Sequence, residues 1–239
     1  MLSPEMTEIL RALHLDAAAP LDDGCVSVLG MDHLVVSLAV DGQVTEQLWS
    51  SDEAGASFED LQFTLGEGPG PDALRTGQAA LEHDLAAVGG ERWPALVPAM
   101  AQLPIRAMFC LPLALGGITV GVLTALRASP GHMSGQQMDD ALGLAAALTL
   151  QFLGGAGARV DAWVDAKPDG ELHRAVVHQA TGMLSVQLEL PLGKALLRLR
   201  AYAYSHDRSI IDTAEDVVSR RLRLDDDNPE PESPKETRG

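Results

Sequence analysis

The chain is 239 residues long and 46% of its residues are hydrophobic, so it is large enough to bury the cores of two compact domains. It carries 17 Lys and Arg against 34 Asp and Glu, and the net charge of −17 excludes a protein that binds nucleic acid over its whole surface. It has no run of about 18 apolar residues and no basic segment followed by an apolar one at the amino terminus, so we expect no membrane span, no secretion signal and a cytoplasmic location.

Residues 1–153 have the pattern of one α/β domain. An opening helix begins near Ser3 and Pro4, and two hairpins follow, turning at Asp41-Gly42 and at Gly116-Gly117. The strands predicted from β-branched and apolar runs are 34–40, 44–49, 107–115 and 118–127. The second pair is the longer and more apolar one, which is typical of the centre of an antiparallel sheet.

A glycine-rich segment and a tryptophan-proline pair lie between the two hairpins. The segment is Leu65-Gly-Glu-Gly-Pro-Gly-Pro-Asp-Ala-Leu74, and it is followed by Asp84-Leu85 and Arg92-Trp-Pro94. In this order the motifs resemble the GAF domains that precede ANTAR modules in actinobacterial regulators, over about residues 20–153. The resemblance implies a sheet covered by helices and a role in sensing a signal.

Glu67 and Trp93 are the candidate ligand-binding residues of this domain, because they stand in its two motifs. The alternative is a glycine-rich turn and a tryptophan that only packs. Related sequences often have a cysteine where this chain has Gly70, so no thiol-based sensing is expected there. The Asn-Lys-Phe-Asp-Glu pattern of cyclic-nucleotide GAF domains is missing and no histidine is marked as a haem ligand, so we expect a small-molecule ligand of unassigned type and no cofactor.

Residues 134–152 predict a long helix with a stripe of apolar and small side chains. The stripe consists of Met138, Leu142, Ala145, Ala146, Thr149 and Phe152. Pairing of this helix between two chains would bury the stripe and make a homodimer, whereas packing against its own sheet is the alternative. Glycines from Gly154 onward end the helix, and residues 154–168 are the expected linker that transmits the signal.

Residues 169–224 predict three short helices that share one core. The apolar face of the first consists of Leu172, Val176, Val177, Ala180, Met183, Leu184 and Leu188, and the opposite polar face of Arg174, His178, Thr181 and Ser185. Gly182 inside this helix indicates close contact with another backbone. The second helix runs from about Pro191 to His206, and the third runs from the N-cap Ser209 to about Arg223.

The same segment resembles the ANTAR domain. The matching runs are His178-Gln-Ala-Thr-Gly-Met183, Lys194-Ala-Leu-Leu-Arg-Leu-Arg-Ala-Tyr-Ala203 and Asp212-Thr-Ala-Glu-Asp-Val-Val218. This chain departs from the many ANTAR sequences that carry a lysine before the core glycine, since Thr181 stands there. The resemblance implies RNA binding.

Candidate RNA contacts follow from residue type within this segment. They are Arg174, His178 and Thr181 in the first helix, Lys194 and Arg198 in the second, Arg208 in the next turn, and Tyr202 and Tyr204 as stacking side chains. Each alone also fits a solvated charge or an aromatic at the edge of a core. Residues 167–224 are the only net-basic part, with 9 basic and 7 acidic side chains, and this slight excess favours recognition of an RNA hairpin loop by shape.

The predicted fold class is α+β, with a GAF-like antiparallel sheet and flanking helices followed by a small all-α module of three helices. Residues 225–239 form an acidic tail that we expect to be disordered. The predicted function is transcription antitermination, in which the GAF part senses a signal and the ANTAR-like part binds a hairpin in nascent transcript. The alternative is a regulatory module that binds a protein or a small molecule and no RNA.

Motifs of the common catalytic sites are missing. The sequence has no phosphate-binding Gly-x-x-x-x-Gly-Lys-Ser/Thr loop, no Gly-x-Ser-x-Gly elbow and no His-Glu-x-x-His zinc site, so we expect no enzyme and no metal. Cys25 and Cys110 lie in apolar runs and outside any Cys-x-x-Cys or Cys/His spacing. Buried, unreactive thiols are therefore expected, with a redox role as the alternative.

Overall fold

The computed structural model describes residues 1–15, 21, 24–40, 43–154, 174–206 and 208–224. It divides the chain into two compact units, Met1–Ala175 and Val176–Gly239. The turn at 41–42, the tail 225–239 and all of the predicted linker except Gly154 lie outside the described residues. Within the described part, no helix combines the length and the apolarity that a bilayer crossing requires.

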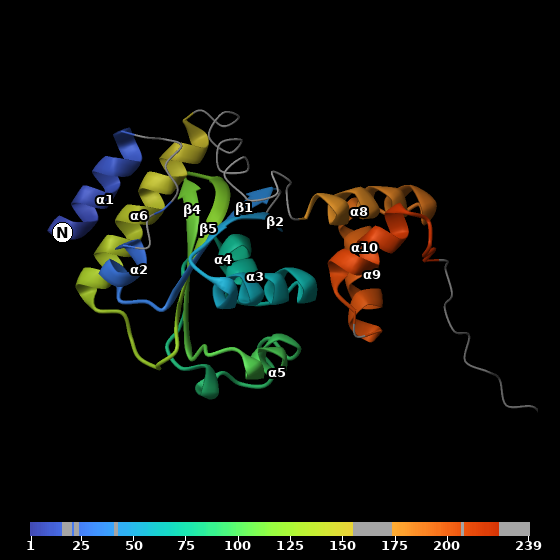
Figure 1. The fold of residues 1–239 in the computed structure, drawn as a ribbon, viewed down its shortest axis with the longest axis horizontal. Coiled ribbons are helices and arrows are strands. Elements are labelled where there is room, and N and C mark those ends of the chain that lie inside the picture. The colour runs from blue at the N-terminus through green and yellow to red at the C-terminus, as the bar shows by residue number, and fades with distance from the viewer. Residues whose placement is uncertain (16–20, 22–23, 41–42, 155–173, 207, 225–239) are drawn as a thin grey trace, which may run out of the picture. The chain divides into compact units, whose positions relative to one another are not determined.

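The first unit is built on a five-stranded antiparallel sheet with the strand order β2-β1-β5-β4-β3 (Figure 1). The strands are β1 (His33–Val40), β2 (Gln43–Ser50), β3 (Ala80–Glu82), β4 (Ala107–Leu115) and β5 (Ile118–Arg127). The four predicted strands are thus confirmed, and the apolar β4–β5 pair lies inside the sheet as expected. At Gly121 of β5 an added Cβ would lie 2.3 Å from the carbonyl oxygen of Ser37, so the close approach of β5 to β1 requires glycine there.

Helices cover both faces of the sheet (Figure 1). On one face α6 (Gly135–Leu153) packs against β4 and β5, with α1 (Pro4–Leu15) and α2 (Gly24–Leu29) beside it, and on the other lie α3 (Glu53–Leu65) and α4 (Pro69–Thr76). The short turns η1 (Leu85–Ala87), α5 (Leu96–Ala99) and η2 (Met100–Gln102) connect β3 to β4. We call the two sides of the sheet the α6 face and the α3–α4 face.

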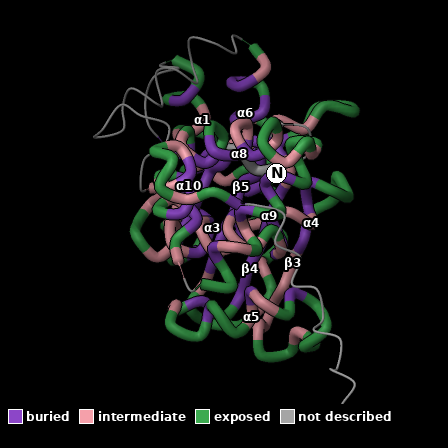
Figure 2. Tube along the Cα trace, turned by 90° about the vertical axis from the view of Figure 1, so that its right-hand side faces the viewer, coloured by how far each residue is buried: buried purple, intermediate pink, exposed green. Residues whose placement is uncertain are grey.

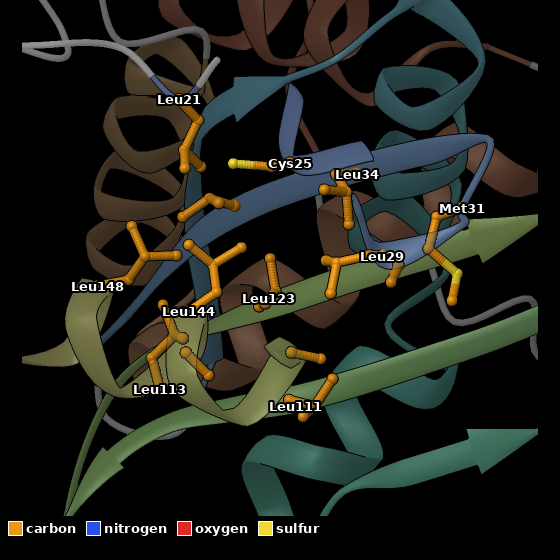
Figure 3. Close-up of a cluster of buried hydrophobic side chains, with 14 of the residues drawn as sticks. Leu21, Cys25, Leu29, Met31, Leu34, Leu111, Leu113, Leu123, Leu144 and Leu148 are labelled. Carbon is orange, nitrogen blue, oxygen red and sulfur yellow. The ribbon is translucent and has the colours of Figure 1, made fainter. Parts of the chain in front are cut away.

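Side chains alternate between these faces because successive residues of a strand point to opposite sides. Leu34, Leu111 and Leu123 belong to the large apolar cluster of the α6 face, which Leu144 and Leu148 of α6 complete (Figure 3). The buried positions run along β4 and β5 in Figure 2. The core of the unit is therefore centred on the middle of the sheet.

Only part of the stripe predicted on α6 is exposed to solvent. Ala145, Thr149 and Phe152 are buried within the first unit, whereas Leu142 is 51% exposed and Ala146 is also exposed. The helix begins with a capping box, in which Ser134 and Gln137 satisfy each other's backbone N–H groups. Met138 also packs against the apolar cluster, so burial within the unit explains four of the six positions of the stripe.

The second unit consists of α8 (Ala175–Gln187), α9 (Leu192–Ser205) and α10 (Ile210–Val218) in its described part. Its buried side chains include Val177, Ala180, Leu184, Ala195, Leu199, Ala203, Ile210, Ala214 and Val217. Of the predicted apolar face of the first helix, Val177, Ala180 and Leu184 are thus buried, Val176, Met183 and Leu188 are half-buried, and Leu172 lies outside the described residues. An added Cβ at Gly182 would meet no described atom within 4 Å, so the predicted close backbone contact there is wrong.

The third helix is shorter than predicted. It ends at Val218 instead of continuing to about Arg223. Arg220 adopts a left-handed conformation with φ of 60°, and the N–H groups of Arg221 and Leu222 both donate to the carbonyl oxygen of Asp216. These bonds satisfy the open end of the helix and stop it one turn early.

Candidate functional site

Polar side chains gather on the α3–α4 face of the sheet. Ser37 of β1, Cys110 of β4 and Thr124 of β5 lie on this side, and Glu59 and Gln62 of α3 complete the group, which we call the buried polar set. Each of the five is at most 1% exposed. The α6 face has one large apolar cluster, whereas on the α3–α4 face these polar side chains accompany two smaller apolar clusters.

Hydrogen bonds join most of the buried polar set. Gln62 Nε2 donates to Glu59 Oε2 at 3.0 Å, and Cys110 Sγ lies 3.5 Å from Thr124 Oγ1. Ser37 Oγ and Glu59 Oε1 are buried and have no partner within normal hydrogen-bond limits among the described residues, although the Ser37 hydroxyl lies close enough to the Glu59 carboxyl to lower its pKa. An unpaired buried polar atom costs about 1–3 kcal/mol, so a hydroxyl and a carboxyl oxygen left in this state indicate a place where a polar ligand group would be stabilised.

Burial sets the protonation states in this interior. It raises the pKa of the Glu59 carboxyl, and the positive charge of Arg174 opposes that rise. Burial also raises the pKa of the Cys110 thiol far above its ordinary value. Both cysteines are free and buried, as predicted, and Cys110 stays a neutral thiol.

The loop that follows α3 positions the predicted residue Glu67. Gly66 ends α3 in a left-handed conformation with φ of 70°, and the backbone N–H of Gly70 donates to Gln62 Oε1 at 2.8 Å. Glu67 Oε1 accepts hydrogen bonds from the N–H groups of Ala95 and Leu96, at 2.6 and 2.7 Å. The carboxylate therefore fastens the glycine-rich loop to the start of α5.

Trp93 is fixed by a second set of contacts. Its ring is 5% exposed, its Nε1 donates to Asp72 Oδ2 at 3.1 Å, and the guanidinium of Arg92 lies 4.2 Å from the ring centroid. Arg92 also pairs with Glu82 and Asp72. The polar groups of Glu67 and Trp93 are thus both hydrogen-bonded within the protein. This agrees with the alternative that the two residues form a turn and a packing contact and do not bind a ligand.

The structure brings together only some of the predicted RNA contacts. His178, Lys194, Arg198 and Tyr204 are exposed in the second unit. Tyr202 is half-buried and stacks on His206, with ring centroids 3.9 Å apart, and Arg208 donates to Asp216 at 2.6 Å. Lys194 and Arg198, one turn apart on α9, share an exposed face that Leu197 and Tyr204 border.

Two predicted contacts are not exposed. Thr181 is buried, and its hydroxyl donates to the carbonyl oxygen of Val177 at 2.7 Å. Arg174 is completely buried in the first unit, where its Nη2 donates to Asp60 Oδ1 at 2.9 Å. The prediction of one polar face shared with His178 is wrong for both, because the helix turns Thr181 inward and Arg174 precedes the helix.

Sequence reasoning missed the buried polar set. The available signal was Ser37 and Thr124, each a hydroxyl residue with apolar neighbours on both sides in its strand. Among the residues that the structure describes, no group of three His, Cys, Asp or Glu is arranged to hold a metal ion. The chemistry of the site is therefore that of hydroxyl, amide, carboxyl and thiol groups.

Solved structures with a similar fold come from several bacteria. The GAF domain of a phosphoenolpyruvate-protein phosphotransferase from Coxiella burnetii is 15% identical with a TM-score of 0.47, and the match covers 62% of this chain and 92% of that one. The corresponding Acinetobacter domain is 12% identical with a TM-score of 0.46, covering 63% and 93%. A free methionine-R-sulfoxide reductase from Neisseria meningitidis, in complex with its substrate, is 16% identical with a TM-score of 0.42, covering 64% and 93%.

The family comparison matches residues 8–156 to the GAF domain. No curated protein gave a significant match to the chain. The matched residues include the whole sheet, the helices on both of its faces except the first turn of α1, and the buried polar set. Since this match spans more than half of the sequence, the chain belongs to the GAF domain family, whose members are signal-sensing and ligand-binding modules.

Proposed function

We propose that the chain is a signal-responsive regulator whose GAF unit binds a small molecule and whose helical unit binds an RNA hairpin in nascent transcript, causing antitermination. Both units act by binding and not by catalysis, and the regulator works in the cytoplasm. The resemblance of residues 169–224 to the ANTAR domain supports the RNA part. The observation that carries it is the exposed face of α9, where Lys194 and Arg198 stand one turn apart, with the exposed Tyr204 further along the same helix.

The chemistry of this face suits a looped RNA. Lysine and arginine bind phosphates, while an exposed aromatic ring stacks on an unpaired base. Tyr204 is 63% exposed, so its ring is available for stacking. Duplex DNA offers phosphates without unpaired bases, and it should therefore bind more weakly than a hairpin.

A fluorescence titration of the full chain with a hairpin RNA, at two salt concentrations and against duplex DNA, tests the RNA proposal. Lys194→Ala and Arg198→Ala should each weaken hairpin binding, and each should reduce the salt slope by roughly one. Arg75→Ala is the matched control, because Arg75 is an exposed arginine of the GAF unit. Unchanged titrations for both α9 variants would remove this face from the RNA site.

The ligand part of the proposal rests on the buried polar set. Ser37 Oγ and Glu59 Oε1 offer a hydroxyl and a carboxyl oxygen to a small polar molecule. Native mass spectrometry of the full chain after exposure to a pool of polar metabolites should show a bound mass that Ser37→Ala weakens. Ser27→Ala, at an exposed serine of α2, should keep the bound mass. Equal retention by both variants would place the ligand elsewhere.

Homodimerisation through α6 is also part of the proposal. Leu142 and Leu150 are 51% and 59% exposed, and with Ala146 they follow one line along the helix. Light scattering should report a dimer for the full chain and a monomer for Leu142→Glu combined with Leu150→Glu. A dimer that survives both substitutions would exclude this surface.

Protein binding by the helical unit is the second candidate function. Val186, Leu192 and Leu197 are 81%, 61% and 63% exposed, which is much apolar surface for so small a unit. The same titration separates the two candidates. No retention of RNA at either salt concentration would favour a protein partner.

A further inference from the structure

An arginine of the chain fills a site on the first unit. Arg174 is 0% exposed although it stands directly before α8. Its backbone N–H donates to Glu46 Oε2 at 3.0 Å, and its Nη2 donates to the carbonyl oxygen of Glu59 at 3.2 Å and to Asp60 Oδ1 at 2.9 Å. The guanidinium carbon lies 3.9 Å from the centroid of the Phe63 ring. Carboxylates combined with an aromatic face are the surroundings that suit a guanidinium.

We propose that Asp60, Phe63 and the carbonyl oxygen of Glu59 bind the guanidinium of Arg174 reversibly while Glu46 holds its backbone N–H, and that this site is a latch on the chain that leads from the GAF unit into α8. The four site residues belong to β2 and α3 of the GAF unit, and Arg174 belongs to the same unit. The latch requires neither RNA binding nor a ligand, so it goes beyond the proposed function.

The contacts of the arginine make this latch a weak one. A guanidinium has five N–H donors, yet Arg174 Nε and Nη1 make no hydrogen bond within the described residues although both are buried. The side chain of Asp60 is 42% exposed, so water competes for its carboxylate. A buried ion pair gains little net free energy when its desolvation is counted, and unpaired donors reduce that gain further. Bound and released states therefore lie close in free energy.

Arg174 stands at the point where the chain enters α8. Only Ala175 separates it from Val176, the first residue of the second unit. While Arg174 is held, the chain is therefore attached to α3 of the first unit directly before α8 continues. Release removes this attachment.

Glu59 connects the latch to the buried polar set. Its carbonyl oxygen accepts from Arg174, while its carboxylate accepts from Gln62 within the set. A molecule that binds at the polar set and shifts this part of α3 must also change the acceptor geometry around Arg174. The latch thus gives the GAF unit a direct route to the chain that enters α8.

Hydrogen exchange of the full chain without RNA tests the latch, with the backbone amide of Arg174 as the reporter. Its bond to Glu46 should protect this amide in the wild type. Asp60→Asn removes one charge at a partly exposed position and should speed exchange at least about tenfold. Arg174→Lys should do the same, because an ammonium cannot reproduce the planar stacking on Phe63.

Matched controls and a competitor sharpen the test. Asp139→Asn and Arg75→Lys change the same residue types at exposed positions and should leave exchange at Arg174 as in the wild type. Methylguanidinium at non-denaturing concentration should speed exchange, whereas methylammonium should have a much smaller effect. Exchange at the unprotected rate in the wild type, or no response to Asp60→Asn in a chain with unchanged circular dichroism, would overturn the latch. Loss of the RNA titration with protection intact would reject only the RNA proposal.

Discussion

Replacing Glu67 by alanine tests whether this residue stabilises the GAF unit or serves to bind a ligand. Its Oε1 accepts two backbone hydrogen bonds, from Ala95 and Leu96, and so joins the loop after α3 to α5. No other described contact of the Glu67 side chain competes with these bonds. Glu67→Ala therefore leaves two N–H groups without their acceptor.

The size of the effect follows from the type of bond. A hydrogen bond to a charged group contributes about 1.5–3 kcal/mol, and the lower end applies here because Glu67 is only half-buried. Two such bonds give about 3 kcal/mol. At roughly 2–4 °C per kcal/mol for a unit of this size, Tm should fall by about 6–12 °C. Glu67→Gln keeps an oxygen acceptor but no charge, so it should retain about half of this stability.

Thermal and urea unfolding followed by tryptophan fluorescence measure the change in Tm and in free energy, because Trp93 is hydrogen-bonded to Asp72 of α4, the helix that follows the loop fastened by Glu67. Glu91→Ala, at an exposed position nearby, is the control and should stay within about 0.5 kcal/mol of the wild type. The reasoning fails if Glu67→Ala is as stable as the control. In that case the two short hydrogen bonds contribute nothing, and a role of Glu67 in ligand binding becomes the better explanation.

Three further predictions concern the interior of the GAF unit. The pKa of Glu59 is raised in the folded chain, so above the ordinary carboxyl pKa of 4.5 the folded chain holds a proton that the unfolded chain releases, and stability falls as the pH rises. Glu59→Gln removes this titration. It should therefore make the unit more stable than the wild type above pH 4.5 and flatten the dependence of its stability on pH. Urea midpoints at acid and neutral pH check this, and an unchanged slope would contradict it. Gly121→Ala should cost several kcal/mol in thermal unfolding, since its Cβ would lie 2.3 Å from a β1 carbonyl oxygen, whereas Gly117→Ala meets no described atom within 4 Å and is the control. Cys25 and Cys110 are buried, so neither should react with a thiol reagent in the folded chain and both should react in urea. A fast reaction of the folded chain with the reagent would show that one of the thiols is accessible.

The strands of the GAF unit are predictable from the sequence because their signal is local. Val35 and Val36 stand in a β-branched and apolar run, and Gly116-Gly117 supplies the turn between two such runs. The family resemblance rests equally on contiguous motifs. Where a side chain lies in the fold, however, depends on tertiary packing, and a short run of sequence carries no information about its packing partners.

The buried polar set illustrates this limit. Ser37, Glu59 and Thr124 come from three elements that are far apart in sequence, and only the pairing of β1 with β5 and the packing of α3 bring them to one face. Arg174 shows the same limit in another way. Helical spacing placed it on the surface of the ANTAR-like segment, but its guanidinium has better partners in Asp60 and Phe63 than in water.

The contrast between the two faces of the sheet has a consequence for how such a unit diverges. The α6 face buries the largest of the three apolar clusters that the described residues of this unit form, and burial of apolar surface stabilises the fold. Residues of the α3–α4 face project from the same strands but take no part in that cluster, so a hydroxyl or an amide there can be exchanged with little loss of the apolar core. At the ligand site proposed above, successive substitutions could therefore change the molecule that is bound while the fold stays the same.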